Sequence, residues 1–382
     1  MNPYLTAETM TYLDNHYYEM LDLLKELCLI PAPSHKEDLR AEFCKNWLEK
    51  QGAKGVYIDE AKNVVFPFGC ENAEKINVVM AHMDTVFPDM EPLPYRFEDG
   101  KIYCPGVGDD TANLVVMLMC VKYILETGLT PKDNKGYLFV CNSCEEGLGN
   151  LKGSRQIVKD YGDKIEGMAS FDGYYGFVVN DAVGSTRYKV EVLTEGGHSY
   201  ANFGNKNAIA VLSSLVCELY KINVPTNGHT TYNVGVINGG TSVNTIAQQA
   251  DMLFEYRSDS REDLQIMKET FDGIVEKFTA EGNDIQVTVL GQRPCKGDVD
   301  DEALASLTKK AVDLNSYYTG GKKIFVGPSS TDCNTTLSAG IPSVCFGTCL
   351  GGGAHTRGEW MLADSLKTGL KLGASWILQY FE

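Results

Sequence analysis

The sequence of 382 residues has few basic side chains, with 34 Lys and Arg against 51 Asp and Glu and a net charge of −17. A negative field of this size repels phosphate backbones and anionic lipid headgroups, so we expect no nucleic-acid partner and no membrane partner. Long hydrophobic runs are also missing. The longest, Leu114 to Val121, is far shorter than the roughly 18 residues of a membrane span.

Cysteine is present but sparse, since twelve in 382 residues is well below the density of a disulfide scaffold. The first residues, MNPYLTAETMTYLDNHYYEML, have no basic start, no apolar stretch and no small-residue cleavage site, so they do not read as a signal peptide. Together these features predict a cytoplasmic protein with reduced thiols.

The composition is that of a folded globular protein, with 43% hydrophobic residues, and the length predicts two or three domains. A helical pattern over residues 8 to 29 opens the chain. Short strands and helices then alternate, which predicts the α/β class with an open mixed sheet covered by helices on both faces. The expected strands are Asn77–Ala81, Tyr137–Asn142, Met168–Phe171 and Ser343–Phe346, and the expected helices are Thr111–Glu126 and Leu151–Tyr161.

Residues 185–293 have their own succession of strand and helix patterns, which predicts an inserted α+β domain with the order βαββαβ. Its expected elements are strands at 188–193, 230–237, 251–257 and 285–290 and helices at 207–220 and 261–279. We therefore expect one domain from residues 1–184 and 294–382, interrupted by a second domain at residues 185–293.

Candidate ligands for a metal ion share one structural position, because each follows a predicted strand. They are His82, the pair Glu145 and Glu146, Asp172 and His355. In open α/β sheets the carboxyl ends of the strands form the edge where ligands bind, so these loops are expected to converge. Asp109, in the sequence GVGDD before the helix at Thr111, approaches the same edge.

Two histidines and several carboxylates suit zinc or a similar divalent cation. Without a cation the acids would repel one another, whereas two ions about 3.5 to 4 Å apart would neutralise them and share one bridging carboxylate. Each candidate alone has an ordinary explanation: His82 with Asp84 as a chance HxD, the two glutamates as a solvated face, Asp172 as a turn residue and His355 as a loop residue. All of them at strand ends, in chain order, favour a metal centre.

These motifs resemble those of the di-zinc exopeptidase and amidohydrolase family that contains glutamate carboxypeptidase, peptidase T, succinyl-diaminopimelate desuccinylase, acetylornithine deacetylase and aminoacylase. The resemblance rests on HMDTVFP at 82–88, GVGDD at 106–110, CEE at 144–146, FDG at 171–173 and AHTRGE at 354–359. It continues in the insert through GGHS at 196–199, GGTSVNTIA at 239–247 and YRSD at 256–259, which are similar to the lid-domain motifs of the family. The resemblance implies a catalytic, metal-binding domain at 1–184 and 294–382 and a lid or dimerisation domain at 185–293.

The resemblance implies a role for each of these residues. His82 and Asp172 would hold one zinc, Glu146 and His355 the other, and Asp109 would bridge them. Asp84 would accept the second ring N–H of His82. Glu145 would act as general base and then as general acid. Cobalt or manganese are alternative metals. Relatives with this motif have a cis peptide bond after the bridging aspartate, so we expect one between Asp109 and Asp110.

In the insert, the resemblance assigns substrate contacts to three residues. His198 would donate to the oxyanion, while Asn244 and Arg257 would hold a substrate carboxylate. In dimeric relatives the position of His198 reaches the partner's active site, so a homodimer through the insert is expected. One departure stands out: many relatives read DDKxG, whereas this chain reads Asp109-Asp110-Thr111-Ala112-Asn113.

The expected function is metal-dependent hydrolysis of an amide bond in small substrates, as an exopeptidase on short peptides. An alternative within the same chemistry is a deacylase or desuccinylase of N-acyl amino acids. An alternative of another class is a metal-binding scaffold without catalysis, which is disfavoured because every catalytic position is present.

Overall fold

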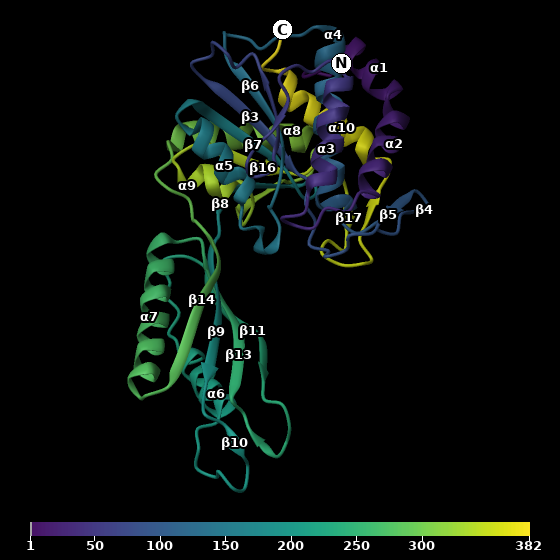
Figure 1. The fold of residues 1–382 in the computed structure, drawn as a ribbon. Coiled ribbons are helices and arrows are strands. Elements are labelled where there is room, and N and C mark those ends of the chain that lie inside the picture. The colour runs from purple at the N-terminus through teal and green to yellow at the C-terminus, as the bar shows by residue number, and fades with distance from the viewer. Residues whose placement is uncertain (1) are drawn as a thin grey trace. The chain divides into compact units, whose positions relative to one another are not determined.

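The computed structural model describes residues 2–382, which divide into two compact units (Figure 1). Unit 1 contains the chain up to Ala182 and from Gly297 onward, and unit 2 contains Val183–Lys296. The insert predicted from the sequence runs from 185 to 293. Each unit has its own apolar core.

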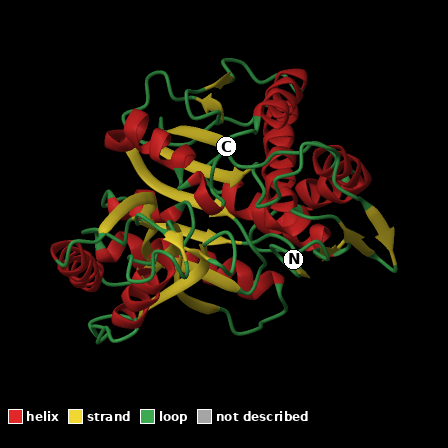
Figure 2. Ribbon diagram, turned by 60° about the horizontal axis from the view of Figure 1, so that its bottom comes forward, coloured by secondary structure: helices red, strands yellow, loops and turns green. Residues whose placement is uncertain are grey.

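Unit 1 is built on an eight-stranded mixed sheet with the order β1-β2-β6-β3-β7-β16-β8-β15. Figure 2 draws the strands of the protein in yellow and its helices in red. Its four central strands β6, β3, β7 and β16 are parallel to one another, while β2 and β8 pair antiparallel with β6 and β16. The strands are β1 (Tyr57–Ile58), β2 (Val64–Phe68), β3 (Ile76–His82), β6 (Gly136–Asn142), β7 (Ile165–Phe171), β8 (Phe177–Ala182), β15 (Phe325–Ser329) and β16 (Ser343–Phe346).

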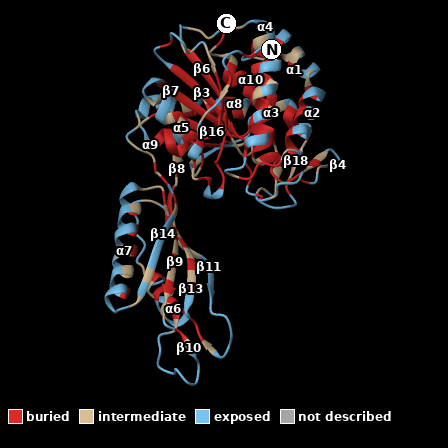
Figure 3. Cartoon of the chain, viewed as in Figure 1, coloured by how far each residue is buried: buried red, intermediate tan, exposed pale blue. Residues whose placement is uncertain are grey.

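Helices cover both faces of this sheet, which confirms the predicted fold class. Successive residues of a strand point to opposite faces, and Val79 packs into one apolar layer while Val78 packs into the other. Burial on both faces explains why the central strands read as continuous apolar runs (Figure 3). The first layer contains α1 (Ala7–Asn15), α2 (Tyr17–Cys28), α3 (Asp38–Lys50), α4 (Ala112–Thr127) and α10 (Ser365–Leu378), the second contains α5 (Lys152–Tyr161) and α9 (Cys333–Ser338), and α8 (Asp301–Tyr318) contributes to both.

The single helix expected over residues 8–29 is wrong, because the chain forms two helices that meet at His16. The backbone of His16 leaves the helical region at φ −96° and ψ 10°. Its ring Nδ1 lies 2.8 Å from the carbonyl oxygen of Tyr12, in the last turn of α1. The same carbonyl oxygen also accepts the backbone N–H of His16 at 3.2 Å, so the ring and the backbone of His16 both close the end of α1.

A second, small sheet of unit 1 has the order β17-β18-β5-β4 and carries the segment around His355. His355 lies between its strands β17 and β18. The sequence did not predict this sheet, nor the strands β1, β2, β8 and β15 of the large sheet. The four strands are β4 (Arg96–Glu98), β5 (Lys101–Tyr103), β17 (Gly351–Gly352) and β18 (Trp360–Leu362).

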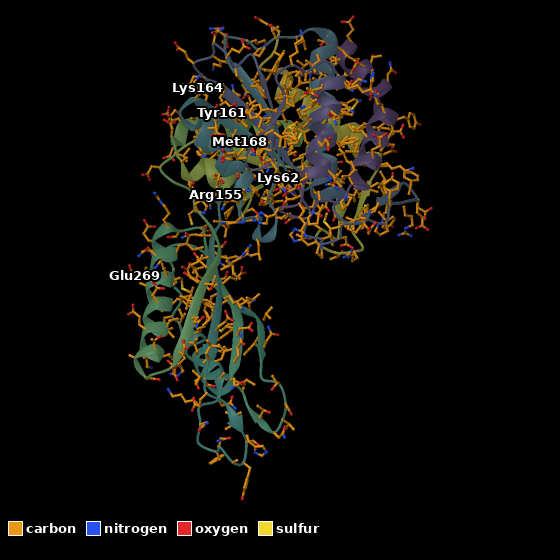
Figure 4. All side chains as sticks on the ribbon, viewed as in Figure 1. Lys62, Arg155, Tyr161, Lys164, Met168 and Glu269 are labelled. Carbon is orange, nitrogen blue, oxygen red and sulfur yellow. The ribbon has the colours of Figure 1, made fainter. Side chains whose placement is uncertain are left out.

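Unit 2 is a four-stranded antiparallel sheet with the order β11-β13-β9-β14, and helices α6 and α7 pack on one face. Alternate residues of β13 are buried, as expected for a sheet with one covered face. In Figure 4, Glu269 stands on α7, while Met168 lies among the side chains of the sheet in unit 1. The elements are β9 (Gly184–Leu193), β10 (Gly197–His198), α6 (Ala208–Leu219), β11 (Thr230–Gly239), β12 (Thr245–Ile246), β13 (Gln249–Ser258), α7 (Arg261–Ala280) and β14 (Asp284–Arg293).

Across residues 2–382, none of the helices combines the length and the apolar character that a membrane crossing requires.

Helix α10 packs closely on the loop after β16, and this contact generates a stability prediction. A Cβ atom at Gly369 would lie 1.5 Å from the carbonyl oxygen of Thr348. We expect Gly369→Ala to lower the free energy of unfolding by at least about 1–3 kcal/mol, the usual effect of overpacking. Denaturant unfolding followed by circular dichroism measures it.

Gly273, inside α7, is the matched control because a Cβ there meets no atom within 4 Å. Gly273→Ala is expected to stabilise by about 0.5–1 kcal/mol through helix propensity. Equal stability of Gly369→Ala and the wild type would contradict the close packing of α10.

Candidate active site

The candidate ligands of unit 1 lie at the carboxyl ends of the four central parallel strands. His82 is the last residue of β3, and Asp172 directly follows β7. Glu145 and Glu146 follow β6 after two residues, and the chain beyond β16 leads through β17 to His355. Because these strands are neighbours in the sheet, their loops share one edge.

Asp109 reaches this edge from an irregular turn, Val107–Thr111, that precedes α4. The turn is held by the buried carboxylate of Glu359, which accepts the backbone N–H groups of Gly106 at 2.6 Å, Gly108 at 2.8 Å and Asp109 at 2.9 Å. Three N–H groups on one carboxylate leave the turn little freedom.

The peptide bond between Asp109 and Asp110 is cis, which confirms the prediction from the motif. The side chain of Asp110 is buried and points to the sheet, where its Oδ2 accepts the backbone N–H of His82 at 2.9 Å. The two adjacent aspartates therefore differ: Asp110 supports the end of β3, and Asp109 faces the histidines.

The two carboxylate oxygens of Asp109 face two different histidines. Oδ1 lies 3.1 Å from Nε2 of His82, and Oδ2 lies 3.1 Å from Nε2 of His355. On the first side Asp172 Oδ1 is 4.0 Å from the same His82 nitrogen, and on the second side Glu146 Oε1 is 3.2 Å from His355 Nε2. The potential ligand atoms of each of these two sets lie within 4.8 Å of one another, and Asp109 belongs to both. Among the described residues a third set of the same kind joins His82, Glu145 and Glu146.

Burial and mutual repulsion dominate the charges of this cluster. Burial, together with the charges of Asp109 and Glu145, raises the pKa of Glu146 to about 7. Burial and the charge of Asp109 also raise the pKa of Asp172 well above its usual range. The pKa of Asp109 is lowered although burial opposes this, because His355 and His82 hydrogen-bond to it. A divalent cation would supply the positive charge that such a set calls for, and imidazole with carboxylate fits zinc and similar metals.

Asp84 differs from the expectation in the atoms that it uses. The nearest acceptor for Nδ1 of His82 is the backbone carbonyl oxygen of Asp84, at 3.0 Å, whereas the carboxylate Oδ1 is 3.5 Å away. The carboxylate instead accepts the backbone N–H of Glu145 at 2.9 Å and of Glu146 at 3.0 Å. The hydroxyl of Ser34 donates to it at 2.6 Å. Asp84 therefore holds the two-glutamate loop, and its backbone holds the histidine ring.

The three candidate substrate contacts lie in unit 2, and they do not form one group within it. His198 and Asn244 are close, because β10 pairs with β12 and the N–H of Ser199 donates to the carbonyl oxygen of Asn244 at 3.0 Å. Arg257 is near the other end of β13, where Nε lies 3.0 Å from Oε1 of Glu255. Eight residues separate Gln249, at the end of β13 nearest to Asn244, from Arg257, or about 26 Å at 3.3 Å per residue.

Sequence reasoning missed the residues that support the cluster. Glu359 and Asp110 are buried acids that accept backbone N–H groups, and Asn113 is a buried amide on the first turn of α4. Only the departure from DDKxG pointed toward Asn113. Glu359 belongs to the AHTRGE motif, but the sequence predicted no role for it.

An α/β sheet whose edge gathers histidines and carboxylates at ligand distance defines the class of metal-dependent hydrolases. A family model described as peptidase family M20/M25/M40 matches residues 78–379, and the chain belongs to this family. It is accordingly an enzyme of the metallopeptidase and amidohydrolase type.

Relatives agree with this assignment over nearly the whole chain. Succinyl-diaminopimelate desuccinylase of Corynebacterium glutamicum is 26% identical over 346 residues, covering 88% of this chain and 90% of that protein. A tripeptidase of Staphylococcus aureus has a similar structure, with a TM-score of 0.75, 22% identity and coverage of 95% and 98%. A dinuclear metal-binding peptidase of Bacillus subtilis has a TM-score of 0.63, with 14% identity and coverage of 96% and 99%.

The hydrogen bonds of Asp84 generate a stability prediction. In Asp84→Asn an amide group replaces one acceptor oxygen, so at least one buried N–H of the two-glutamate loop loses its partner. We expect the free energy of unfolding of the metal-free protein to fall by about 1–3 kcal/mol, measured by denaturant titration.

Ser34→Ala is the control, since it removes one hydroxyl donor and leaves both backbone bonds in place; about 0.5–1.5 kcal/mol is expected. If Asp84→Asn proved no less stable than Ser34→Ala, the backbone contacts of Asp84 would not be what holds the loop.

Proposed function

We propose that this enzyme is an exopeptidase that removes terminal residues from short peptides with the help of two divalent cations, zinc in the first place. The observation that carries the proposal is the placement of Asp109, whose two oxygens lie equally far from His82 and His355. His82 and Asp172 would hold one cation, Glu146 and His355 the other, and Asp109 would bridge them.

When bound, such cations lower the pKa of water from about 15.7 toward about 7 and polarise the scissile carbonyl group. Glu145 is assigned the proton transfers. It is buried, and its backbone N–H is held by Asp84. One of its carboxylate oxygens lies within 4.8 Å of a ring nitrogen of His82 and a carboxylate oxygen of Glu146. From this position it takes a proton from water as the C–O bond forms, and it gives the proton to the amine as the C–N bond breaks.

The decisive experiment is a panel of dipeptides, tripeptides and N-acyl amino acids assayed with zinc, cobalt or manganese. Faster turnover of peptides supports the exopeptidase. The second candidate is an N-acyl amino acid deacylase or desuccinylase, which the similarity to a desuccinylase favours. Inactivity across the panel, with two cations bound, would instead indicate a scaffold without catalysis.

We propose that unit 2 supplies the substrate contacts, with Arg257 holding the free carboxylate of the substrate. A guanidinium fork binds a carboxylate through two parallel hydrogen bonds. Arg257 donates from Nε and one terminal nitrogen to the carboxylate of Glu255, at 3.0 and 3.1 Å, and a substrate carboxylate would take the place of Glu255 in this pair. A cytoplasmic location agrees with the twelve free cysteines.

We further propose a homodimer through unit 2. A tripeptide spans only about 10 Å, whereas His198 and Arg257 of one chain are separated by nearly the whole length of β13. A second copy can bring its His198 and Asn244 to a site that already has Arg257. Sedimentation equilibrium should give twice the mass of the chain, and a monomer active at nanomolar concentration would contradict the dimer.

The assignment of the two adjacent glutamates predicts different defects. Glu145→Gln should lower kcat by about 10² to 10⁴ and leave the metal content unchanged, because the variant loses the base but no ligand. Glu146→Gln should lose metal. Metal analysis by plasma mass spectrometry and peptide assays test both. The opposite pattern of metal loss would reverse the two roles.

Arg257→Ala should raise KM at least tenfold for peptides with a free carboxylate, because a bidentate contact is lost. Peptides with an amidated terminus serve as the control substrates and should change little. Steady-state kinetics on both forms measure the difference, and equal losses would make Arg257 a structural residue.

A further inference from the structure

Asn113 is a buried side chain for which the proposed reaction has no use. It lies on the first turn of α4, is 0% exposed, and stands where the chain departs from the DDKxG pattern. Its carboxamide nevertheless makes short hydrogen bonds to three separate loops of the candidate site.

The donor side of the carboxamide holds two of these loops. Nδ2 donates to Oδ1 of Asp110 at 2.6 Å and to the carbonyl oxygen of Gly173 at 2.9 Å. Asp110 in turn accepts the N–H of His82, and Gly173 is the neighbour of Asp172. One NH₂ group thus connects the ends of β3 and β7 with the turn that contains Asp109.

The acceptor side holds the third loop. Oδ1 accepts both the backbone N–H and the hydroxyl of Thr348, each at 2.6 Å. Thr348 comes two residues after β16 and opens the segment that leads to His355. Gly369 of α10 lies against its carbonyl oxygen, so Thr348 is held from two sides.

These four short bonds use the full hydrogen-bonding capacity of a carboxamide, which has two N–H donors and two acceptor lone pairs. A longer contact, 3.4 Å from Nδ2 to the carbonyl oxygen of Gly108, adds a second link to the turn that contains Asp109. Asp would lack the donors, Leu would lack both kinds of group, and Gln would be too long by one methylene. A fully satisfied polar group in a dry interior fixes the spacing of whatever it connects.

We propose that Asn113 is a positioning residue for the metal centre. It sets the separation of the loops that carry His82, Asp109, Asp172 and His355, while Asp84 does the same for Glu146. This inference rests on the proposed two-cation function. Ligand atoms must lie within about 0.2 Å of the preferred metal distances, so a residue that spaces the loops controls affinity without touching the metal.

The test compares Asn113→Leu with Asn315→Leu. Asn315 is the matched control because it is equally buried, and it bonds the carbonyl oxygen of Ala311 at 2.9 Å and the N–H of Gly176 at 3.4 Å. Cobalt is the probe. Its affinity is measured by competition with a chromophoric chelator, and its visible absorption spectrum reports the coordination geometry.

We expect Asn113→Leu to bind cobalt about 10- to 100-fold more weakly than the wild type and to shift the absorption spectrum. The midpoint of unfolding should also rise less on addition of cobalt, because metal-linked stabilisation follows affinity. Asn315→Leu should lose stability with and without cobalt alike, and keep wild-type affinity and spectrum.

A milder pair keeps the test decisive if Asn113→Leu does not fold. Thr348→Val removes one of the two bonds to Oδ1 and should weaken cobalt binding about threefold to tenfold. Thr348→Ser keeps the hydroxyl and should restore binding.

Wild-type affinity and spectrum in both Asn113→Leu and Thr348→Val would overturn the positioning role while leaving the proposed function intact. A wild-type protein that binds no divalent cation would overturn the proposed function, and the positioning role with it.

Discussion

Repulsion among buried carboxylates is the constraint on which the rest of this structure depends. The ends of β6 and β7 and one turn bring Glu145, Glu146, Asp172 and Asp109 to a single edge of the sheet. Among the described residues, two histidines face them, His82 at the end of β3 and His355 beyond β16. In a medium of low dielectric constant such a set either takes up protons or binds cations. In the protein without metal, the raised pKa values of Glu146 and Asp172 favour the uptake of protons. The metal dependence of the family corresponds to the binding of cations.

The acids near this edge divide into two groups according to what their oxygens face. Asp84, Asp110 and Glu359 accept backbone N–H groups, which occupy lone pairs that a metal would need. Asp109 and Glu146 instead direct oxygens at histidine nitrogens. A supporting acid and a candidate ligand therefore differ in their donors rather than in their residue type. This difference distinguishes Asp109 from Asp110 although the two are adjacent.

The parts of the fold and site that could be predicted are those with a strong local signal. The central strands of a parallel sheet are buried on both faces, so each produces an uninterrupted apolar run such as that of β3. Once strands alternate with helices, topology brings the residues after them to one edge. His82, the two glutamates, Asp172 and His355 followed from these two facts, whereas Asp109 was predicted from its glycine-rich loop before a helix. The cis peptide after Asp109 did not, since nothing local favours it, and its prediction came only from the resemblance of the motif.

What could not be predicted depends on partners that are distant in the sequence. Asn113 and Thr348 are 235 positions apart, and Glu359 is 251 positions from Gly108, so no window of sequence contains both members of either bond. At shorter range, HxD correctly placed Asp84 near His82 but could not tell a carbonyl oxygen from a carboxylate. A motif specifies which residues are present, but it does not specify which atoms they contact or whether they act in their own subunit or in a second copy of the chain. For His198 and Arg257, which β13 keeps apart, the decisive question is whether the two residues act in the same copy.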